Sequence, residues 1–155
     1  MSTDDHSMLH HQDRITLEAP PQEVWDAIKD FDSIHTWHPA AESTVMLVGE
    51  NGKPLAVREF QTTDGGFVIS ELLEYDEAKR WFKYRIIKSS LPIRGYVGEM
   101  QVVPTDDGGS EVLWSAQFER PDEVSQSGQE GPPVEEMVQG IFRAGLENLR
   151  VVVSG

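Results

Sequence analysis

The sequence contains no cysteine. Disulfide bonds, zinc sites built on cysteine and catalysis by a thiol are therefore excluded. Long apolar runs are also absent, since none approaches the ~20 residues that cross a bilayer. Residues 1–14 lack the basic start and the apolar centre of a signal peptide. We therefore expect a cytoplasmic protein that does not insert into a membrane.

Basic residues are scarce. The chain has 13 lysine and arginine residues against 27 aspartate and glutamate residues, which gives a formal net charge of −14. Nucleic acids and anionic membrane surfaces are bound through a basic footprint. We expect neither as a partner. The acidic residues are spread along the whole chain, which favours solubility.

A chain of 155 residues with 38% hydrophobic residues is long enough for one domain with its own core. We assign that domain to residues 13–153. Residues 1–12 are polar and include His6, His10 and His11. We expect this segment to be a disordered tail, with a metal-binding cluster as the alternative.

Hydrophobic periodicity predicts the order of the secondary-structure elements. A strand at 14–18 is followed by two short helices, one starting at Pro21 and one at 33–37. The predicted strands after them are 43–49, a hairpin within 55–75, 80–88, 95–104 and 110–118. A polar loop rich in glycine and proline, which we expect to be mobile, follows at 120–133. Apolar residues at helical spacing then predict a long helix at 134–152.

This order is typical of an α+β fold. A curved antiparallel sheet of about seven strands needs a cover for its apolar face. Only the helix at 134–152 is long enough, at about 1.5 Å per residue. A sheet that curves around one helix leaves a gap between them, and such a gap is a natural pocket for an apolar ligand.

The hairpin within 55–75 contains Asp64-Gly65 between two strand-like runs, which is a strong turn signal. If the loop has an even number of residues, Arg58 lies opposite Glu71. Residues alternate between the two faces of a strand. The inward face would then carry Arg58 and Glu71 among the apolar side chains of Ala56, Phe60, Phe67, Ile69 and Leu73.

An arginine opposite a glutamate in an apolar surround suggests acid/base chemistry. Glu71 would take a proton from the substrate, and Arg58 would hold an oxyanion or a carboxylate. A buried salt bridge is the first alternative. A surface pair is the second, if the register slips by one residue. Tyr96 is either a proton donor to the substrate or a core aromatic residue. His38 and His35 stand at the pocket mouth or at a helix end, and we expect no metal site there.

Several patterns recur in order along residues 13–152. They are Val24-Trp25, Phe31, Trp37-His38-Pro39, Val57-Arg58, Asp64-Gly65-Gly66, Glu71-Leu72, Asp76, Tyr84, Leu91-Pro92, Tyr96, Trp114-Ser115, Phe118, residues 140–146 and Leu149. Together they resemble the polyketide cyclase/dehydrase branch of the START-like superfamily. The resemblance implies a helix-grip fold, with a cavity for a hydrophobic small molecule between the sheet and the long helix.

The chain also resembles the plant lachrymatory factor synthases of that superfamily. Their catalytic arginine, glutamate and tyrosine fall on Arg58, Glu71 and Tyr96. The ligand-binding residues that we expect are Trp37, His38, Phe60, Ile69, Leu73, Tyr84, Met100, Trp114, Phe118, Phe142 and Leu146. In plant hormone receptors of the same fold a similar charged pair binds ligand without reaction, so the pair alone does not establish catalysis.

Three functions are open at this point. The first is a cofactor-independent enzyme for cyclisation, dehydration or isomerisation of a hydrophobic molecule that bears oxygen. The second is a carrier or sensor of such a molecule without catalysis. The third is a protein-interaction module that uses the 120–133 loop. We expect neither a cofactor nor a metal, and homodimer formation stays open.

Overall fold

The computed structural model describes residues 8–119 and 134–154. In these residues the elements follow in the order β1 (Leu9–Leu17), α1 (Pro21–Ile28), the 3-10 helix η2 (Phe31–Thr36), β2 (Ala41–Val48), β3 (Val57–Thr62), β4 (Phe67–Asp76), β5 (Trp81–Ser89), β6 (Arg94–Pro104), β7 (Ser110–Glu119) and α3 (Val134–Ser154). The predicted order of elements is confirmed. The loop expected at 120–133 and the histidine at position 6 lie outside the described residues.

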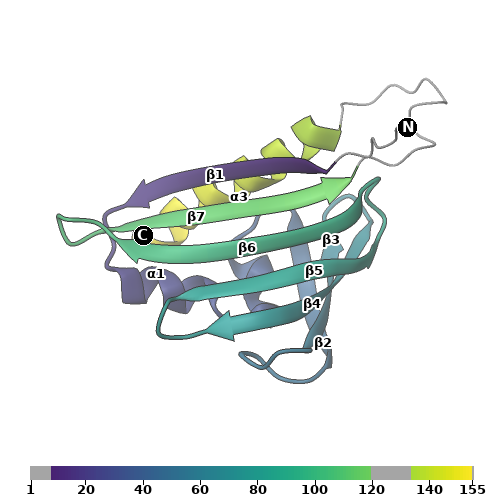
Figure 1. Cartoon of the computed structure of the whole chain (residues 1–155), viewed down its shortest axis with the longest axis horizontal. Coiled ribbons are helices and arrows are strands. Elements are labelled where there is room, and N and C mark those ends of the chain that lie inside the picture. The colour runs from purple at the N-terminus through teal and green to yellow at the C-terminus, as the bar shows by residue number, and fades with distance from the viewer. Residues whose placement is uncertain (1–7, 120–133, 155) are drawn as a thin grey trace.

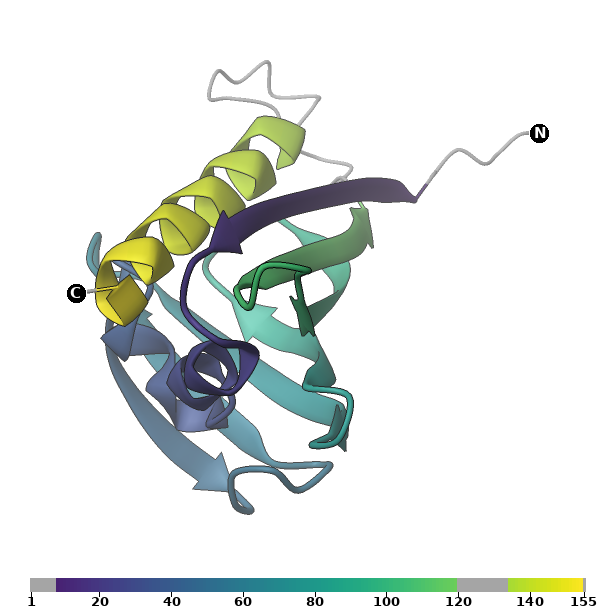
Figure 2. The same cartoon turned by 90° about the vertical axis from the view of Figure 1, so that its left-hand side faces the viewer.

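All seven strands form one antiparallel sheet in the order β1-β7-β6-β5-β4-β3-β2. The sheet is curved, and the helices lie on its concave side (Figures 1 and 2). The predicted α+β helix-grip architecture is therefore confirmed. No helix within the described residues is both long and apolar enough to cross a membrane.

The first strand begins earlier than the sequence predicts. β1 starts at Leu9, so the disordered tail that we expected up to residue 12 is wrong for residues 9–12. His10 pairs with Gln117 of β7, and His11 pairs with Ala116. Alternation along the strand turns these histidines to opposite faces, and His11 packs inward, with its ring centroid 5.3 Å from that of Phe142. His10 and His11 therefore do not face a common metal site.

The long helix buries one stripe of side chains. Val138, Phe142, Leu146 and Leu149 of α3 recur every three or four residues, and all four are buried. This spacing places them on one face of a helix, toward the sheet. Burying each such side chain stabilises the fold by about 1.5–3 kcal/mol. The stripe therefore fixes α3 over the concave face of the sheet.

Gly145 lets α3 approach the rest of the core closely. A Cβ atom at this position would lie 2.6 Å from Cδ2 of His38 and 3.0 Å from ring carbons of Trp37 and Trp114. Any side chain here would push α3 away from these three rings. The glycine is thus required by packing, although glycine is a poor helix former.

The β3–β4 hairpin has a three-residue loop, and the predicted register is wrong by one residue. The Thr62 amide donates to the Gly66 carbonyl across the loop Thr63-Asp64-Gly65, at 2.9 Å. Gly65 has a φ of 92°, as the last residue of such a loop requires. Arg58 consequently pairs with Ser70, while Glu71 pairs with Val57.

A shift of one residue turns every side chain of a strand to the other face. The buried residues of β4 are Val68, Ser70 and Leu72. Glu71 lies on the opposite face, where its Oε1 is 2.8 Å from Nε of Arg85 on β5. The expected inward pairing of Arg58 with Glu71 is therefore wrong.

Candidate functional site

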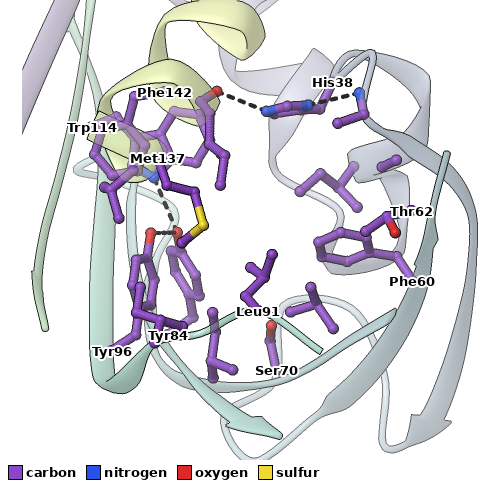
Figure 3. Close-up of a pocket in the computed structure, with 18 of the residues that line it drawn as sticks. His38, Phe60, Thr62, Ser70, Tyr84, Leu91, Tyr96, Trp114, Met137 and Phe142 are labelled. Atoms are coloured by element: carbon purple, nitrogen blue, oxygen red, sulfur yellow. Dashed lines mark hydrogen bonds between the residues drawn. The ribbon is translucent and has the colours of Figure 1, made fainter. Parts of the chain in front are cut away.

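A cavity of about 230 Å³ lies between α3 and the concave face of the sheet (Figure 3). Most of its wall is aliphatic. These residues are Ile34, Ala40, Ala41, Val68, Ile86, Leu91, Ile93, Met137, Val138 and Ile141. Phe60, Tyr84, Tyr96, Trp114 and Phe142 add aromatic rings, and His38, Arg58, Thr62 and Ser70 add polar groups. The cavity therefore offers an apolar surround with a few polar contacts, which is typical of small-molecule sites.

The structure brings part of the predicted site together. The predicted residues on the cavity wall are Arg58, Tyr96, His38, Phe60, Tyr84, Trp114 and Phe142. Trp37, Met100, Phe118 and Leu146 are instead buried in the surrounding core and do not line the cavity. Glu71, Ile69 and Leu73 lie on the other face of β4, because the register differs from the predicted one.

Sequence reasoning missed several wall residues. Val68 and Ser70 were missed because of the register error. Met137, Val138 and Ile141 belong to the predicted apolar stripe of the long helix, but the stripe alone does not tell which turn faces a void. Leu91 and Ile93 come from the β5–β6 connection, where the Leu91-Pro92 pattern was the available signal.

Arg58 is a buried cation without a carboxylate partner in the described residues. Its side chain reaches the Phe31 carbonyl, to which Nη1 donates at 2.8 Å, and its guanidinium carbon lies 4.1 Å from the Phe31 ring centroid. Nε is buried and has no hydrogen-bond partner. Burial lowers the pKa of Arg58 to about 10, so the group keeps its charge at neutral pH.

Tyr84, Tyr96 and Trp114 form a short hydrogen-bond chain. Nε1 of Trp114 donates to the Tyr84 hydroxyl at 3.0 Å, and the two phenolic oxygens are 2.8 Å apart. The indole N–H and the two phenolic O–H groups supply three protons, but the chain contains two hydrogen bonds. One phenolic O–H therefore has no acceptor in this chain, whichever tyrosine donates. Burial raises the pKa of both phenols, which keeps them protonated.

The position of Tyr84 depends on a glycine in the next strand. Tyr84 pairs with Gly98 of β6, and a Cβ atom at Gly98 would lie 2.7 Å from Cζ and the hydroxyl oxygen of Tyr84. The missing side chain makes room for the tyrosine ring against the sheet. The phenol therefore reaches both Trp114 and Tyr96.

His38 has no free ring nitrogen for acid/base chemistry. Its Nε2 lies 2.8 Å from the Ile141 carbonyl, and its Nδ1 accepts from the Ala40 amide at 3.1 Å. A proton on Nε2 and none on Nδ1 satisfies both contacts, so the ring is neutral. Burial, reinforced by the charge of Arg58, lowers the pKa of His38. His38 thus ties the segment after η2 to α3.

Ser70 adds a polar group that has no partner in the protein. It is 1% exposed, and its Oγ makes no hydrogen bond. Arg58, Ser70, Tyr84 and Tyr96 come from four successive strands of the sheet and face the same cavity. Their unpaired polar groups are mainly hydrogen-bond donors, and no aspartate or glutamate is among the described wall residues. The cavity is therefore suited to a ligand with hydrogen-bond acceptors.

The sequence matches a family profile over almost its whole length. Residues 8–154 match the profile described as "Polyketide cyclase / dehydrase and lipid transport". None of the curated proteins matches the sequence.

Several solved structures are similar to this chain. Protein XoxI from Bacillus cereus is 24% identical with a TM-score of 0.79, covering 93% of this chain and 94% of that one. An uncharacterised protein from Bacillus thuringiensis is 24% identical with a TM-score of 0.80, covering 95% and 100%. A protein from Thermobifida fusca is 27% identical with a TM-score of 0.77, covering 91% and 90%. These likenesses concern the fold.

Proposed function

This chain belongs to the polyketide cyclase/dehydrase and lipid transport family, and on that premise we propose that it binds a small hydrophobic molecule bearing acceptor oxygens, as a carrier or sensor. The observation that carries the proposal is the cavity of about 230 Å³, whose accessible surface is almost entirely apolar and whose lining includes a few residues with hydrogen-bond donors. Its volume is below the usual range of about 300–1,000 Å³ for ligand pockets. The bound molecule is accordingly small.

The chemistry of the wall favours binding over the acid/base mechanism that the sequence suggested. That mechanism needs a base, and Glu71 is engaged with Arg85 on the other face of β4. His38 uses both ring nitrogens within the protein. The remaining polar groups can hold oxygen atoms of a ligand but do not include a free carboxylate.

Two neighbouring residues of β4 test the proposal. Val68 lines the cavity, whereas Ile69 lies on the opposite face of the strand. Octanoate and cinnamate serve as probes, with binding measured by isothermal titration calorimetry. We expect Val68→Phe to fill the cavity and weaken binding of both probes at least tenfold. Ile69→Phe is the matched control and keeps the wild-type affinity.

Circular dichroism confirms that both variants are folded before they are compared. The proposal fails if neither probe binds to the wild-type protein. It also fails if Val68→Phe is folded and binds as well as the wild type, because the ligand would then lie elsewhere.

A cofactor-independent dehydration, cyclisation or isomerisation is the second candidate function. It is favoured by the phenolic O–H without an acceptor in the Tyr84–Tyr96 pair, next to the charge of Arg58, whose guanidinium carbon is 5.7 Å from the Tyr84 ring centroid. Such a pair can polarise a carbonyl or protonate a leaving oxygen. Molecules that bind are incubated with the protein and followed by NMR. Conversion that is lost in Tyr96→Phe supports an enzyme, and unchanged recovery supports a carrier.

A further inference from the structure

We propose that the ligand carries a carboxylate and that Arg58 is its counter-ion inside the cavity. The inference rests on the proposed function and specifies the chemical class of the molecule bound there. Its basis is a buried cation that forms no ion pair with a carboxylate of the described residues, although the charge of Asp32 acts on it from a distance.

The charge of Arg58 lacks a partner within the described residues. The side chain is buried, and no aspartate or glutamate forms an ion pair with it. Removing a cation from water costs several kcal/mol unless an anion and hydrogen bonds replace the water. The fold supplies one carbonyl, that of Phe31, and the rings of Phe31, Phe60 and Tyr84, whose centroids lie 4.1, 5.4 and 5.7 Å from the guanidinium carbon. An anionic ligand would supply the missing compensation.

Neighbouring strands also carry hydrogen-bond donors that a carboxylate could use. A guanidinium has five N–H donors, and Arg58 uses one of them in a hydrogen bond to the protein. Ser70 lies directly opposite Arg58 in the β3–β4 register, and its hydroxyl is unpartnered. The phenolic O–H of the tyrosine pair is the next donor along the sheet. A carboxylate is an acceptor at both oxygens and can take two guanidinium N–H groups at once.

The formal net charge of −14 does not oppose this assignment strongly. Exposed charges farther away than the Debye length, about 8 Å at physiological salt, are largely screened from the cavity. Arg58 is inside the cavity wall and out of water, where screening is weak. The selection of an anion is therefore a local property of this residue.

The rest of the wall limits the anion to a monovalent group on an apolar body. Arg58 is the sole cationic side chain among the described wall residues. A doubly charged phosphate would remain undercompensated by one guanidinium and two hydroxyl groups. The other wall residues are aliphatic or aromatic, apart from Thr62, whose hydroxyl donates to Asp64, and His38, whose ring is neutral and has both nitrogens engaged within the protein. A carboxylate on a short aliphatic or aromatic body fits these constraints.

Matched acids and amides test the charge of the ligand. Octanoate is compared with octanamide, and cinnamate with cinnamamide, by isothermal titration calorimetry at pH 7.5. The amides have the same size and keep an acceptor oxygen, but they are neutral. We expect each acid to bind the wild-type protein at least tenfold more tightly than its amide. Octylammonium, with the opposite charge, is expected not to bind.

Variants of Arg58 test whether this residue causes the preference for the acid over the amide. In Arg58→Gln the acid and the amide are expected to bind within threefold of each other. Arg58→Lys keeps the charge without the planar fork, so a reduced preference for the acid is expected. Glu71→Gln is the control on the other face of the sheet and is expected to keep the full preference.

The outcomes separate this inference from the function on which it rests. If acid and amide bind the wild type equally well, the carboxylate assignment is overturned while the binding function stands. If no compound of the panel binds, both are overturned. If Arg58→Gln folds and keeps the full preference for the acid, Arg58 is rejected as the anchor. If Arg58→Gln does not fold, Arg58→Lys decides, and an unchanged ratio of acid to amide affinity in that variant would reject Arg58 as the anchor.

Discussion

At the scale of single residues, two buried polar side chains of the cavity wall differ in how well the protein satisfies them. Both ring nitrogens of His38 have partners in the protein. Arg58 has one hydrogen bond and an unpartnered Nε. A satisfied polar group stabilises the fold, whereas an unsatisfied one costs free energy until something binds it. His38 therefore has a structural role, whereas the unsatisfied Arg58 is the residue that we propose to bind the ligand.

The neutral state of His38 makes stability depend on pH. Its pKa in the folded protein is below the ordinary value of 6.5. Between these two pKa values the unfolded chain binds more protons than the folded protein. The contribution of His38 to the free energy of unfolding is thus fully present above pH 6.5 and is lost as the pH falls below it.

Thermal unfolding followed by circular dichroism at pH 7.5 and pH 5.5 checks this prediction. The wild-type midpoint is expected to fall further over this interval than the midpoint of His38→Gln, which has no imidazole to protonate. His35→Gln, at an exposed histidine of η2, is the control and should resemble the wild type. Equal losses in wild type and His38→Gln would contradict the prediction.

At the scale of elements, the sequence predicts what depends on local periodicity. The stripe of α3 and the alternation in β5, β6 and β7 are local, so their faces could be predicted. The face of β4 depends on the length of one loop. A two-residue and a three-residue loop around Asp64-Gly65 place Glu71 on opposite faces of β4. Alternation alone cannot decide between these loops.

A signal for the three-residue loop was nevertheless present in the sequence. The stretch Thr62-Thr63-Asp64-Gly65-Gly66 has a counterpart in residues 105–109, Thr-Asp-Asp-Gly-Gly. In both loops the threonine hydroxyl donates to the aspartate carboxylate, and the amide of the second glycine donates to the same carboxylate. Two copies of one pattern in one chain indicate that both loops have the same geometry, and a three-residue loop gives the observed register.

The sequence does not predict how far the cavity extends along each strand. Tyr96 and Met100 share the inner face of β6, yet only Tyr96 lines the cavity. The part of the sheet near Met100 and Val102 is covered by other elements, among them α1, which contacts β6. Which end of an apolar face stays open depends on how distant elements pack, and periodicity does not report that.

Two glycines of α3 give opposite predictions for the same substitution. A Cβ atom at Gly140 would meet nothing within 4 Å, whereas one at Gly145 would meet His38, Trp37 and Trp114. Gly140→Ala is therefore expected to stabilise the protein by about 0.5–1 kcal/mol through helix propensity. Gly145→Ala gains the same propensity but is expected to destabilise by about 1–3 kcal/mol through overpacking.

Urea unfolding measures both changes. The pair forms its own control, because the chemical change and the helix are the same. An equal effect of both substitutions would mean that the close approach at Gly145 is not a constraint on the fold.

At the scale of the whole molecule, the cavity links ligand binding to stability. A ligand that binds only the folded protein raises the free energy of unfolding by about 2.7 kcal/mol at a concentration 100 times its Kd. For a domain of this size that corresponds to roughly 5–10 °C in the thermal midpoint. We expect octanoate to raise the midpoint of the wild type by this amount.

Differential scanning calorimetry over a series of octanoate concentrations checks the effect. Val68→Phe, with its cavity filled, is expected to show a shift below 1 °C at the same concentrations. Equal shifts in both proteins would place the stabilising site outside the cavity.

The order of strands in the sheet has a consequence for biosynthesis. β1 pairs with β7, although β1 is the first strand of the described chain and β7 the last. Strands β2 to β7 pair with neighbours in sequence and can form as the chain leaves the ribosome. Ile15 and Leu17 of β1 must wait until β7 has been made, and contacts between distant segments form slowly. The cavity itself closes only when α3 arrives, so the site that we propose for a ligand is incomplete until translation of that helix is finished.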